Sequence, residues 1–278
     1  MTLSIIIVNF NVTDLLRNCI LSIDKFVKDI SYEIIVVDNN SPDSSWKILI
    51  KEFPKVKFIA AETNRGFSVA NNRGAQHATG SYLLLLNPDT KFESYNFNEI
   101  IDFVADMKDF GCLGVRMHNG NGSFLPESKR SIPDMFNSFE KLFLSFRKNT
   151  FKSYYRNDIN EFSVAPVDVV TGAFLLIKTD VYRKIGGLDE QYFMYGEDID
   201  LCYTLIQNHY KNWYYGNLSI VHFKGESTIK NSEYLKRFYG AMQIFIEKYY
   251  KEKYPIQYII LSIGLKVRFV IEQIKLNF

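Results

Sequence analysis

The fold is decided by the stretch Leu3-Ser4-Ile5-Ile6-Ile7-Val8-Asn9-Phe10-Asn11, an apolar run of strand length that ends in polar residues. Similar apolar runs recur along the first ninety residues, and helix-like segments separate them. This alternation is the pattern of a mainly parallel sheet that helices cover. We therefore predict an α/β fold, a single Rossmann-like domain, with strands at Leu3–Val8, Glu33–Val37, Val56–Ala60 and Tyr82–Leu86.

Helices are predicted between these strands, at Asp14–Phe26, Ser44–Phe53 and Phe67–Ala78. The second of them follows Ser41-Pro42-Asp43, which we interpret as a helix start with Ser41 as the capping residue. Farther along the chain we expect a strand near Cys112–Met117, a helix from Glu197, strands near Trp213 and Ser219–Phe223, and helices over the last forty residues.

The composition argues against several classes of protein. A chain of 278 residues with 47% hydrophobic content can bury a sizeable core, which argues against disorder. Its 33 basic and 31 acidic residues leave a formal net charge of +2, so we expect no nucleic-acid partner. Met1–Asn9 lacks the basic start of a signal peptide, and no apolar run has the length of a membrane span. The cysteines are odd in number and lie in apolar stretches, which predicts reduced core thiols at Cys19, Cys112 and Cys202.

Three of the predicted strands end in polar residues, and we expect a binding site at that edge of the sheet. Ligands of open parallel sheets bind at the carboxyl ends of the strands, which here are Asn9-Phe10-Asn11, Asp38-Asn39-Asn40 and Asn87-Pro88-Asp89. Asp38 can accept hydrogen bonds from a ribose hydroxyl or a base N–H, although an aspartate in such a segment also commonly binds its own turn. The first turn lacks the glycine fingerprint of dinucleotide-binding sites, and the chain has no P-loop.

The segment Asn87-Pro88-Asp89 offers oxygen ligands for a cation. Proline fixes the backbone, so the two flanking side chains project to the same side of an extended segment. A hard cation such as Mg²⁺ or Mn²⁺, shared with substrate phosphates, needs little more than one carboxylate. His222 ends an apolar strand and is either a further ligand or a structural histidine. Arg65, beside a predicted helix start, either holds a negatively charged or polar ligand or is solvated.

An acidic pair, Glu197 and Asp198, begins a later predicted helix. Carboxylates in a first helical turn often only offset the helix dipole. Here, however, the aromatic and glycine-bearing segment Tyr192-Phe193-Met194-Tyr195-Gly196 comes directly before them. A carboxylate in such apolar surroundings can serve as a general base, so this pair is the candidate catalytic group.

Taken together and in this order, these segments resemble the family 2 glycosyltransferases of the GT-A fold, and closely the bacterial rhamnosyltransferase-type members. The resemblance runs from Ser4 to about Ser227, over four fifths of the chain. The matching stretches are Ser4–Asn11, Ile35–Asn39, Asn64–Phe67, Leu85–Asp89, Thr171–Phe174, Gly186–Glu190, Tyr195–Leu201 and Val221–His222.

The resemblance implies a GT-A catalytic domain over residues 1–230 and a C-terminal helical, amphipathic extension over residues 231–278. Residues 1–90 would form the half that binds a nucleotide-sugar donor, and residues 91–230 the half that binds the acceptor and carries the catalytic groups. The residues that would bind the donor nucleotide are Asn9, Asp38, Asn64, Arg65 and Asn87.

The resemblance also implies a metal site, a base and an acceptor pocket. Asp89 matches a metal ligand of the family's DxD motif, and His222 matches the histidine that completes the metal site in some members, with Mg²⁺ or Mn²⁺ as the cation. Asp198, the second residue of the Glu197–Asp198 pair, matches the base that deprotonates the acceptor hydroxyl. Thr171 and Gly172 would border the acceptor and sugar pocket.

The implied activity is an inverting transfer of a sugar to a glycan or polyprenyl-linked acceptor in the biosynthesis of cell-surface polysaccharide, with L-rhamnose from dTDP-rhamnose as the best candidate. Asn87 departs from the family, because it stands where the DxD motif has its first aspartate and an amide brings no charge. An alternative is therefore a glycosyltransferase-like scaffold that binds nucleotide without catalysis. A sugar-phosphate nucleotidyltransferase would need a glycine-rich basic loop after the first strand, which is absent.

The last predicted helix is amphipathic and too charged to span a membrane. Arg268, Glu272 and Lys275 lie opposite its apolar face, which either binds a membrane surface or packs on the domain or a second subunit, as in a homodimer. Basic and aromatic residues alternate within Lys141–Arg156, which favours peripheral attachment at the cytoplasmic side of the cell membrane. The residues of the apolar face are Ile256, Ile260, Ile263, Val267, Val270, Ile271 and Ile274.

Overall fold

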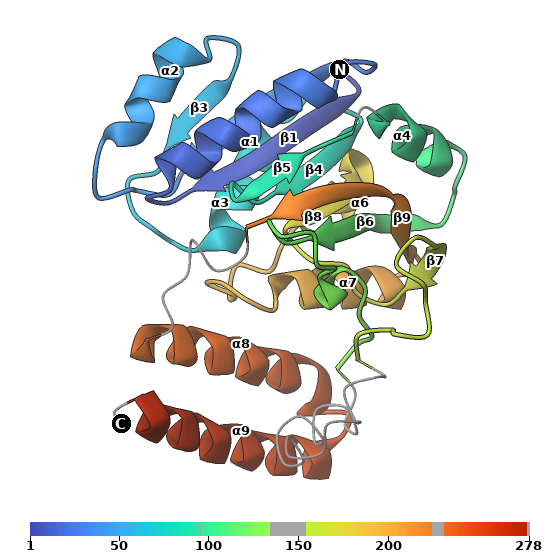
Figure 1. Ribbon diagram of the computed structural model, residues 1–278. Coiled ribbons are helices and arrows are strands. Elements are labelled where there is room, and N and C mark those ends of the chain that lie inside the picture. Colours follow the sequence, from blue (N-terminus) through green and yellow to red (C-terminus); the bar gives the residue numbers. More distant parts are fainter. Residues whose placement is uncertain (95, 134–153, 224–230, 277–278) are drawn as a thin grey trace.

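A computed structural model of the chain describes residues 1–94, 96–133, 154–223 and 231–276. A twisted sheet lies between two layers of helices, and a pair of long C-terminal helices lies to one side of this unit (Figure 1). The strands are β1 (Leu3–Asn9), β2 (Tyr32–Asp38), β3 (Lys57–Ala60), β4 (Tyr82–Leu86), β5 (Thr90–Phe92), β6 (Phe110–His118), β7 (Val164–Val167), β8 (Phe174–Lys178) and β9 (Lys211–His222).

The strands form one nine-stranded sheet in the order β3-β2-β1-β4-β8-β6-β9-β5, with β7 paired to β9. The first four strands of this order run parallel, and β8 runs antiparallel to both β4 and β6. Because Leu86 at the end of β4 pairs with Phe174 at the start of β8, the segment that leads into β8 reaches the carboxyl edge of the parallel strands.

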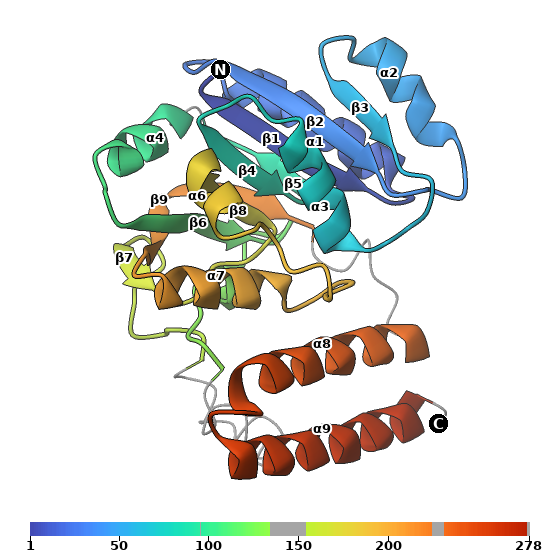
Figure 2. The ribbon, with the colours of Figure 1, turned by 180° about the vertical axis from the view of Figure 1, so that it is seen from behind.

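Helices cover both faces of the sheet, as the views in Figures 1 and 2 show. One layer contains α1 (Thr13–Phe26), α2 (Ile48–Glu52) and α4 (Phe97–Ala105). The other contains α3 (Phe67–Gln76), α6 (Thr179–Lys184) and α7 (Glu197–Gln207). Short 3-10 helices span Ser45–Lys47 (η1) and Pro126–Ser128 (η2), and the C-terminal pair consists of α8 (Ser232–Tyr250) and α9 (Pro255–Leu276).

The two helical layers explain why β1 is apolar at every position except Ser4 and Asn9. Successive side chains of a strand point to opposite faces, so Ile5 and Ile7 pack in the core with α1, while Ile6 packs in the core on the other face. All seven residues of β1 are buried. The α/β fold with C-terminal helices that the sequence predicted is confirmed, because a continuous apolar run is what a doubly covered strand requires.

The predicted helix start at Ser41 is wrong. Helical structure begins at Ser45, with the 3-10 helix η1. The Ser41 hydroxyl instead donates to Oδ1 of Asp38 at 2.6 Å, and the carboxylate of Asp43 accepts the Ser45 N–H at 3.0 Å. The polar side chains of this segment therefore close the loop after β2 before the helix begins. The strands predicted separately near Trp213 and from Ser219 are one strand, β9.

The helices α8 and α9 run side by side, with α9 on the side away from the sheet in both views (Figures 1 and 2). Leu261 and Leu265 of α9 are buried in a cluster with Ile246 of α8, while Arg268 and Glu272 form an ion pair at 3.0 Å. The apolar face predicted for this helix points away from the described structure, because its residues are 40–73% exposed: Ile256, Ile260, Ile263, Val267, Val270, Ile271 and Ile274.

Two sequence expectations about membranes can be compared with this structure. Among the helices that the structure describes, none combines the length and the apolarity needed to cross a bilayer. Of the basic and aromatic tract Lys141–Arg156, residues 141–153 lie outside the described residues.

The three cysteines are free and buried, as predicted.

Candidate active site

The carboxyl edge of β1 and β2 holds a buried polar pair. Asn9 pairs in register with Asp38, and its Nδ2 donates to Oδ1 of Asp38 at 2.8 Å. Both side chains are buried. The amide oxygen of Asn9 has no hydrogen-bond partner among the described residues. A buried acceptor of this kind favours a ligand that donates a hydrogen bond, such as a base or ribose group.

Hydrogen bonds from Asn9 and Ser41 occupy most of the acceptor positions of the Asp38 carboxylate. Oδ1 also accepts the Ser41 hydroxyl, and Oδ2 accepts the Ser41 N–H at 3.0 Å. Because a carboxylate has about four acceptor positions, these two bonds and the one from Asn9 leave one position on Oδ2 within the described structure. Asp38 thus organises its own turn and can still accept a single hydrogen bond from a nucleoside.

Asn64 and Arg65 lie on the loop that leads from β3 into α3. Oδ1 of Asn64 accepts the Asn39 amide at 2.9 Å and the Gly66 N–H at 3.0 Å, so Asn64 joins this loop to the one after β2. Arg65 is 67% exposed, with its guanidinium 3.8 Å from Glu190. Asn64 therefore holds the two loops together, while Arg65 forms an exposed ion pair, which contributes little to stability.

Asp89 and His222 meet beside the end of β4. Thr90 pairs in register with His222, which brings Nε2 of His222 to 3.3 Å from Oδ1 of Asp89. Both residues are buried. Nδ1 of His222 has no hydrogen-bond partner among the described residues. Asp89 and His222 are therefore in contact, although they lie far apart in the sequence.

This donor set suits a divalent cation that is shared with a substrate. A carboxylate oxygen and an imidazole nitrogen are both common ligands of transition-metal ions. Among the described residues no three histidine, cysteine or acidic side chains form a cluster, so the protein offers an incomplete shell. Phosphate oxygens of a bound nucleotide would supply the remaining ligands, as is usual for sites that hold a cation through substrate.

Glu197 and Asp198 begin α7 behind a turn with unusual backbone geometry. Tyr195 has φ of 71° and Gly196 has φ of 83°, so two successive residues are left-handed. This conformation strains a residue as bulky as tyrosine. The Tyr195 ring packs against Tyr234 of α8, with ring centroids 5.4 Å apart. Contact with α8 thus holds the turn that sets the position of the acidic pair.

Asp198 forms a buried ion pair with Arg130. Nη2 of Arg130 lies 2.6 Å from Oδ2 of Asp198, and the same nitrogen donates to the Val170 carbonyl. Oδ2 also accepts the Gly172 N–H at 3.1 Å, while Oδ1 accepts the Ile199 N–H at 2.8 Å. The Asp198 side chain is 13% exposed. Oδ1 therefore keeps one acceptor position within the described structure.

Glu197 has a different environment from Asp198. Burial, and next to it the negative charge of Asp198, raise the pKa of the Glu197 carboxyl well above its usual range. One of its oxygens, Oε2, has no hydrogen-bond partner among the described residues. The Glu197 carboxyl therefore keeps its proton at neutral pH, beside the ion-paired Asp198.

Backbone hydrogen bonds join the end of the β4 segment to the start of α7. The Asn87 N–H donates to the Ala173 carbonyl at 3.1 Å. The N–H of Gly172, the residue before Ala173, donates to the Asp198 carboxylate. A Cβ atom at Gly172 would lie 3.6 Å from Cβ of Asp198 and 3.9 Å from Oε1 of Glu197. The absence of a side chain at Gly172 leaves space beside both acids. The adjacent Thr171 accepts the Ala173 N–H at 3.4 Å through its hydroxyl.

Two residues of this site were not identified from the sequence. Arg130 lies in a tract without periodicity, so no pattern indicated that its guanidinium would be buried against Asp198. Asp200 belongs to the same acidic helix start, yet its carboxylate turns to α8, where it accepts the Tyr249 hydroxyl at 2.8 Å and the Lys248 ammonium at 3.0 Å. Three acids in one helical turn thus have three different surroundings.

Two cavities border this edge. One, of about 730 Å³, lies between the start of α1 and the loop before α2 and is lined by Asn11, Asp14 and Ser44 among others. The other, of about 210 Å³, lies between α7 and the C-terminal helices and is lined by Gly196 and Ile199, among others.

Comparison with known proteins identifies the family of the chain. Residues 4–186 match the family described as glycosyl transferase family 2. The chain is 25% identical over 227 residues to N-acetylglucosaminyl-diphospho-decaprenol L-rhamnosyltransferase of Mycobacterium tuberculosis, covering 77% of this chain and 74% of that protein. It is 26% identical over 187 residues to rhamnosyltransferase WbbL of Escherichia coli K12, covering 64% of this chain and 67% of that protein.

A solved structure with the same fold is that of GalNAc-T7 with UDP, GalNAc and Mn²⁺. It superimposes with a TM-score of 0.68 at 19% sequence identity, over 91% of this chain and 48% of that one. At this level of identity the likeness concerns the fold.

Proposed function

This chain belongs to glycosyl transferase family 2 and is a nucleotide-sugar glycosyltransferase, and from that premise we propose that it transfers the sugar with inversion, with Asp198 as the base. Residues 1–90 bind the donor nucleotide, residues 91–230 bind the acceptor and carry the base, and residues 231–278 form a helical extension. Asn9, Asp38, Asn64, Arg65 and Asn87 line the donor side of this proposed site.

The observation that carries the proposal is the backbone connection from Asn87 to Asp198. The end of β4 binds the Ala173 carbonyl, and Gly172 next to it binds the Asp198 carboxylate. A sugar attached to a diphosphate near Asn87 and Asp89 would therefore have its anomeric carbon on the side of Thr171 and Gly172, within reach of an acceptor hydroxyl that Asp198 holds. Inverting transfer needs this order of leaving group, sugar and base.

The proposed step is a single in-line displacement. The acceptor hydroxyl loses its proton to Oδ1 of Asp198 while its oxygen forms a bond to the anomeric carbon. The bond from that carbon to the diphosphate oxygen breaks, and the electron pair leaves with the nucleoside diphosphate. Because a single displacement occurs from the opposite side, the anomeric configuration inverts. The ion pair with Arg130 holds the Asp198 carboxylate in place before the proton arrives.

A divalent cation fits the donor side. Asp89 and His222 would hold it, and bound there it would supply positive charge that stabilises the departing diphosphate. The GalNAc-T7 structure contains Mn²⁺, which supports a cation of the Mg²⁺ or Mn²⁺ type in this proposed site. Asn87, a neutral residue in the segment, would leave the net charge of the site less negative than a pair of aspartates.

The names of the relatives support a donor and an acceptor. Two are L-rhamnosyl- or rhamnosyltransferases, and the first acts on a sugar linked through a diphosphate to decaprenol. We propose dTDP-rhamnose as the donor and a polyprenyl-linked glycan of cell-surface polysaccharide as the acceptor. The exposed isoleucines of α9, together with the exposed Lys266, support attachment to the cytoplasmic face of the cell membrane, where such a lipid is reached.

The test is donor turnover by the full-length protein. It is incubated with a panel of nucleotide sugars and with Mn²⁺, Mg²⁺ or EDTA, with membrane extract supplied as acceptor, and released nucleoside diphosphate is measured for wild type and Asp89→Ala. Cation-dependent release from one donor that the variant loses supports the proposal and identifies the sugar. Asn87 favours a second candidate, a nucleotide-binding scaffold without catalysis, which would bind nucleotide and release no diphosphate from any donor.

A further inference from the structure

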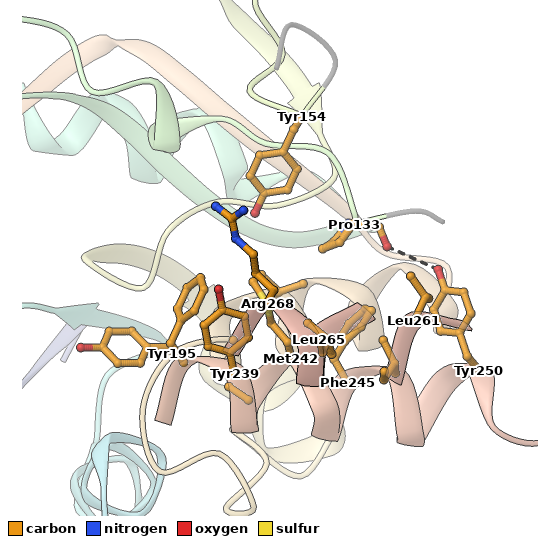
Figure 3. Close-up of a pocket in the computed structure, with 15 residues that line it drawn as sticks. Pro133, Tyr154, Tyr195, Tyr239, Met242, Phe245, Tyr250, Leu261, Leu265 and Arg268 are labelled. Atoms are coloured by element: carbon orange, nitrogen blue, oxygen red, sulfur yellow. Dashed lines mark hydrogen bonds between the residues drawn. The ribbon is translucent and has the colours of Figure 1, made fainter. Parts of the chain in front are cut away.

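An apolar cavity lies between the C-terminal helices and the start of α7 (Figure 3). Its volume is about 210 Å³. Aromatic and aliphatic side chains from three helices and the turn before α7 form its walls, among them Tyr195, Ile199, Phe238, Met242, Phe245 and Leu265. An apolar hollow of this composition suits a hydrocarbon chain rather than a sugar, which needs hydrogen-bond partners.

The cavity adjoins the proposed base. Gly196 and Ile199 line it, and they flank Glu197 and Asp198 in the first turn of α7. This part of the cavity wall therefore lies within about one helical turn, roughly 5 Å along the axis, of the acidic pair. The cavity thus lies on the acceptor side of the site, away from Asp38 and Asp89.

A positive charge stands at one side of this apolar space. Arg268 of α9 lines the cavity, and Figure 3 shows its guanidinium turned away from Leu265 and Met242, toward the side of Tyr154. The guanidinium also pairs with Glu272 at 3.0 Å, and both side chains are about one quarter exposed. Arginine matches the geometry of phosphate oxygens and forms charge-assisted hydrogen bonds with them.

The outer face of the same helix is the exposed isoleucine surface. Leu261 and Leu265 of α9 face the cavity, while Ile260 and Ile263 point outward. One helix therefore separates an apolar surface that suits a bilayer from an apolar cavity that leads to the base. A lipid that lies in the bilayer would have to pass only this helix to bring its polar end to Asp198.

We propose that this cavity binds the first isoprene units of a polyprenyl-diphosphate-linked acceptor, with Arg268 at its diphosphate. This inference rests on the proposed function and specifies how its acceptor is held. A cavity of about 150 Å³ holds one benzene molecule, so about 210 Å³ has room for roughly eight carbon atoms, or one to two isoprene units. The remainder of the chain would lie along α9 and in the bilayer.

The test measures binding of geranylgeranyl diphosphate to the full-length protein by isothermal titration calorimetry. Leu265→Trp fills the cavity and is expected to weaken binding at least about 10-fold. Ile263→Trp places the same side chain on the exposed side of α9, and binding is expected to stay within about 2-fold of wild type. If Leu265→Trp does not fold, as judged by circular dichroism, Met242→Trp takes its place.

A second pair of variants tests the charge. Arg268→Gln is expected to weaken the binding of geranylgeranyl diphosphate about 10-fold. It should change the binding of geranylgeraniol little, because the alcohol has no phosphate. Lys275→Gln removes the other cation that pairs with Glu272, at 3.1 Å, and is expected to leave both ligands unaffected. Equal loss of both ligands in Arg268→Gln would show a packing effect and overturn the role of Arg268.

Three results would overturn the cavity assignment. The first is that Leu265→Trp binds geranylgeranyl diphosphate as tightly as wild type does. The second is that inorganic diphosphate binds wild type as tightly as geranylgeranyl diphosphate does. The third is that palmityl phosphate binds wild type as tightly as geranylgeranyl diphosphate does and displaces it, which would indicate a general lipid site. Donor turnover separates this inference from the proposed function. Release of nucleoside diphosphate without binding of geranylgeranyl diphosphate refutes the cavity alone, whereas binding without release from any donor refutes the function.

Discussion

Nη2 of Arg130 lies 2.6 Å from Oδ2 of Asp198, inside the protein and next to the Val170 carbonyl that the same nitrogen binds. Arg130→Gln would leave the carboxylate buried without its cation. Because breaking a buried ion pair is costly, we expect a loss of about 3–5 kcal/mol in the free energy of unfolding. Urea unfolding of wild type and variant measures it.

A double-mutant cycle separates the ion pair from packing. Asp198→Asn in the Arg130→Gln background removes the uncompensated charge, so the combined loss should be smaller than the sum of the two single losses by roughly 1–3 kcal/mol. Arg65→Gln, a matched change at an exposed position, should alter stability by less than about 0.5 kcal/mol. Additive losses in the cycle would mean that the pair does not act as a unit.

Glu197 should make stability depend on pH. Burial and the charge of Asp198 raise its pKa to about 8, so the folded protein keeps a proton that the unfolded chain loses near pH 4 to 5. This contribution is complete below that range and is lost as pH rises through about 8, by up to ~1.4 kcal/mol per pH unit. Glu197→Gln cannot ionise, so its unfolding free energy should fall less between pH 5 and 8. Parallel profiles would contradict the shift.

Donor turnover should respond to the Asp89–His222 pair. In Asp89→Ala we expect stimulation by Mn²⁺ to disappear, because the proposed cation loses its charged ligand. In His222→Gln the Mn²⁺ concentration for half-maximal release should rise on the order of 10-fold. His77→Gln, a change at an exposed histidine, is the control. Identical Mn²⁺ dependence in wild type and His222→Gln would remove the histidine from the proposed site.

Vesicle binding should depend on the outer face of α9. Ile263→Asp combined with Val267→Asp places two charges on a face whose residues are 57% and 49% exposed, and should abolish co-sedimentation with anionic vesicles. Ile48→Asp changes an isoleucine of α2 that is 59% exposed and should have no effect. If the wild-type protein does not bind vesicles, and the double variant has a lower molar mass than wild type in light scattering, the outer face of α9 contacts a second subunit instead.

The sequence predicts the first half of the fold closely. The apolar runs of β1, β2 and β4 are buried on both faces, and such continuous runs fit a strand covered by helices on both sides better than other elements. It also predicts the meeting of Asp89 and His222. It fails where polar side chains act locally, as at Ser41, whose hydroxyl binds Asp38 rather than a helix N-terminus. It fails as well where contacts are distant, as for Arg130 and Asp198, which lie 68 positions apart.

The sequence also does not predict which face of α9 packs on the protein. The periodicity of α9 identifies its apolar face correctly, but periodicity alone does not say which face packs on the protein. The structure buries Leu261 and Leu265 and exposes Ile256 and Ile263, so the most regular apolar face is the outer one. Leu261 and Leu265 pack in a cluster with Ile246 of α8, and this contact, which periodicity alone does not reveal, sets the inner face of α9.

The central claim is that Asp198 takes the proton of the acceptor hydroxyl. The most direct test is kcat for sugar transfer by wild type and Asp198→Asn, with nucleotide affinity measured in parallel. The asparagine keeps the size of the side chain and cannot accept the proton, so kcat should fall on the order of 10²- to 10⁴-fold while nucleotide affinity is unchanged. Wild-type kcat in Asp198→Asn would contradict the account.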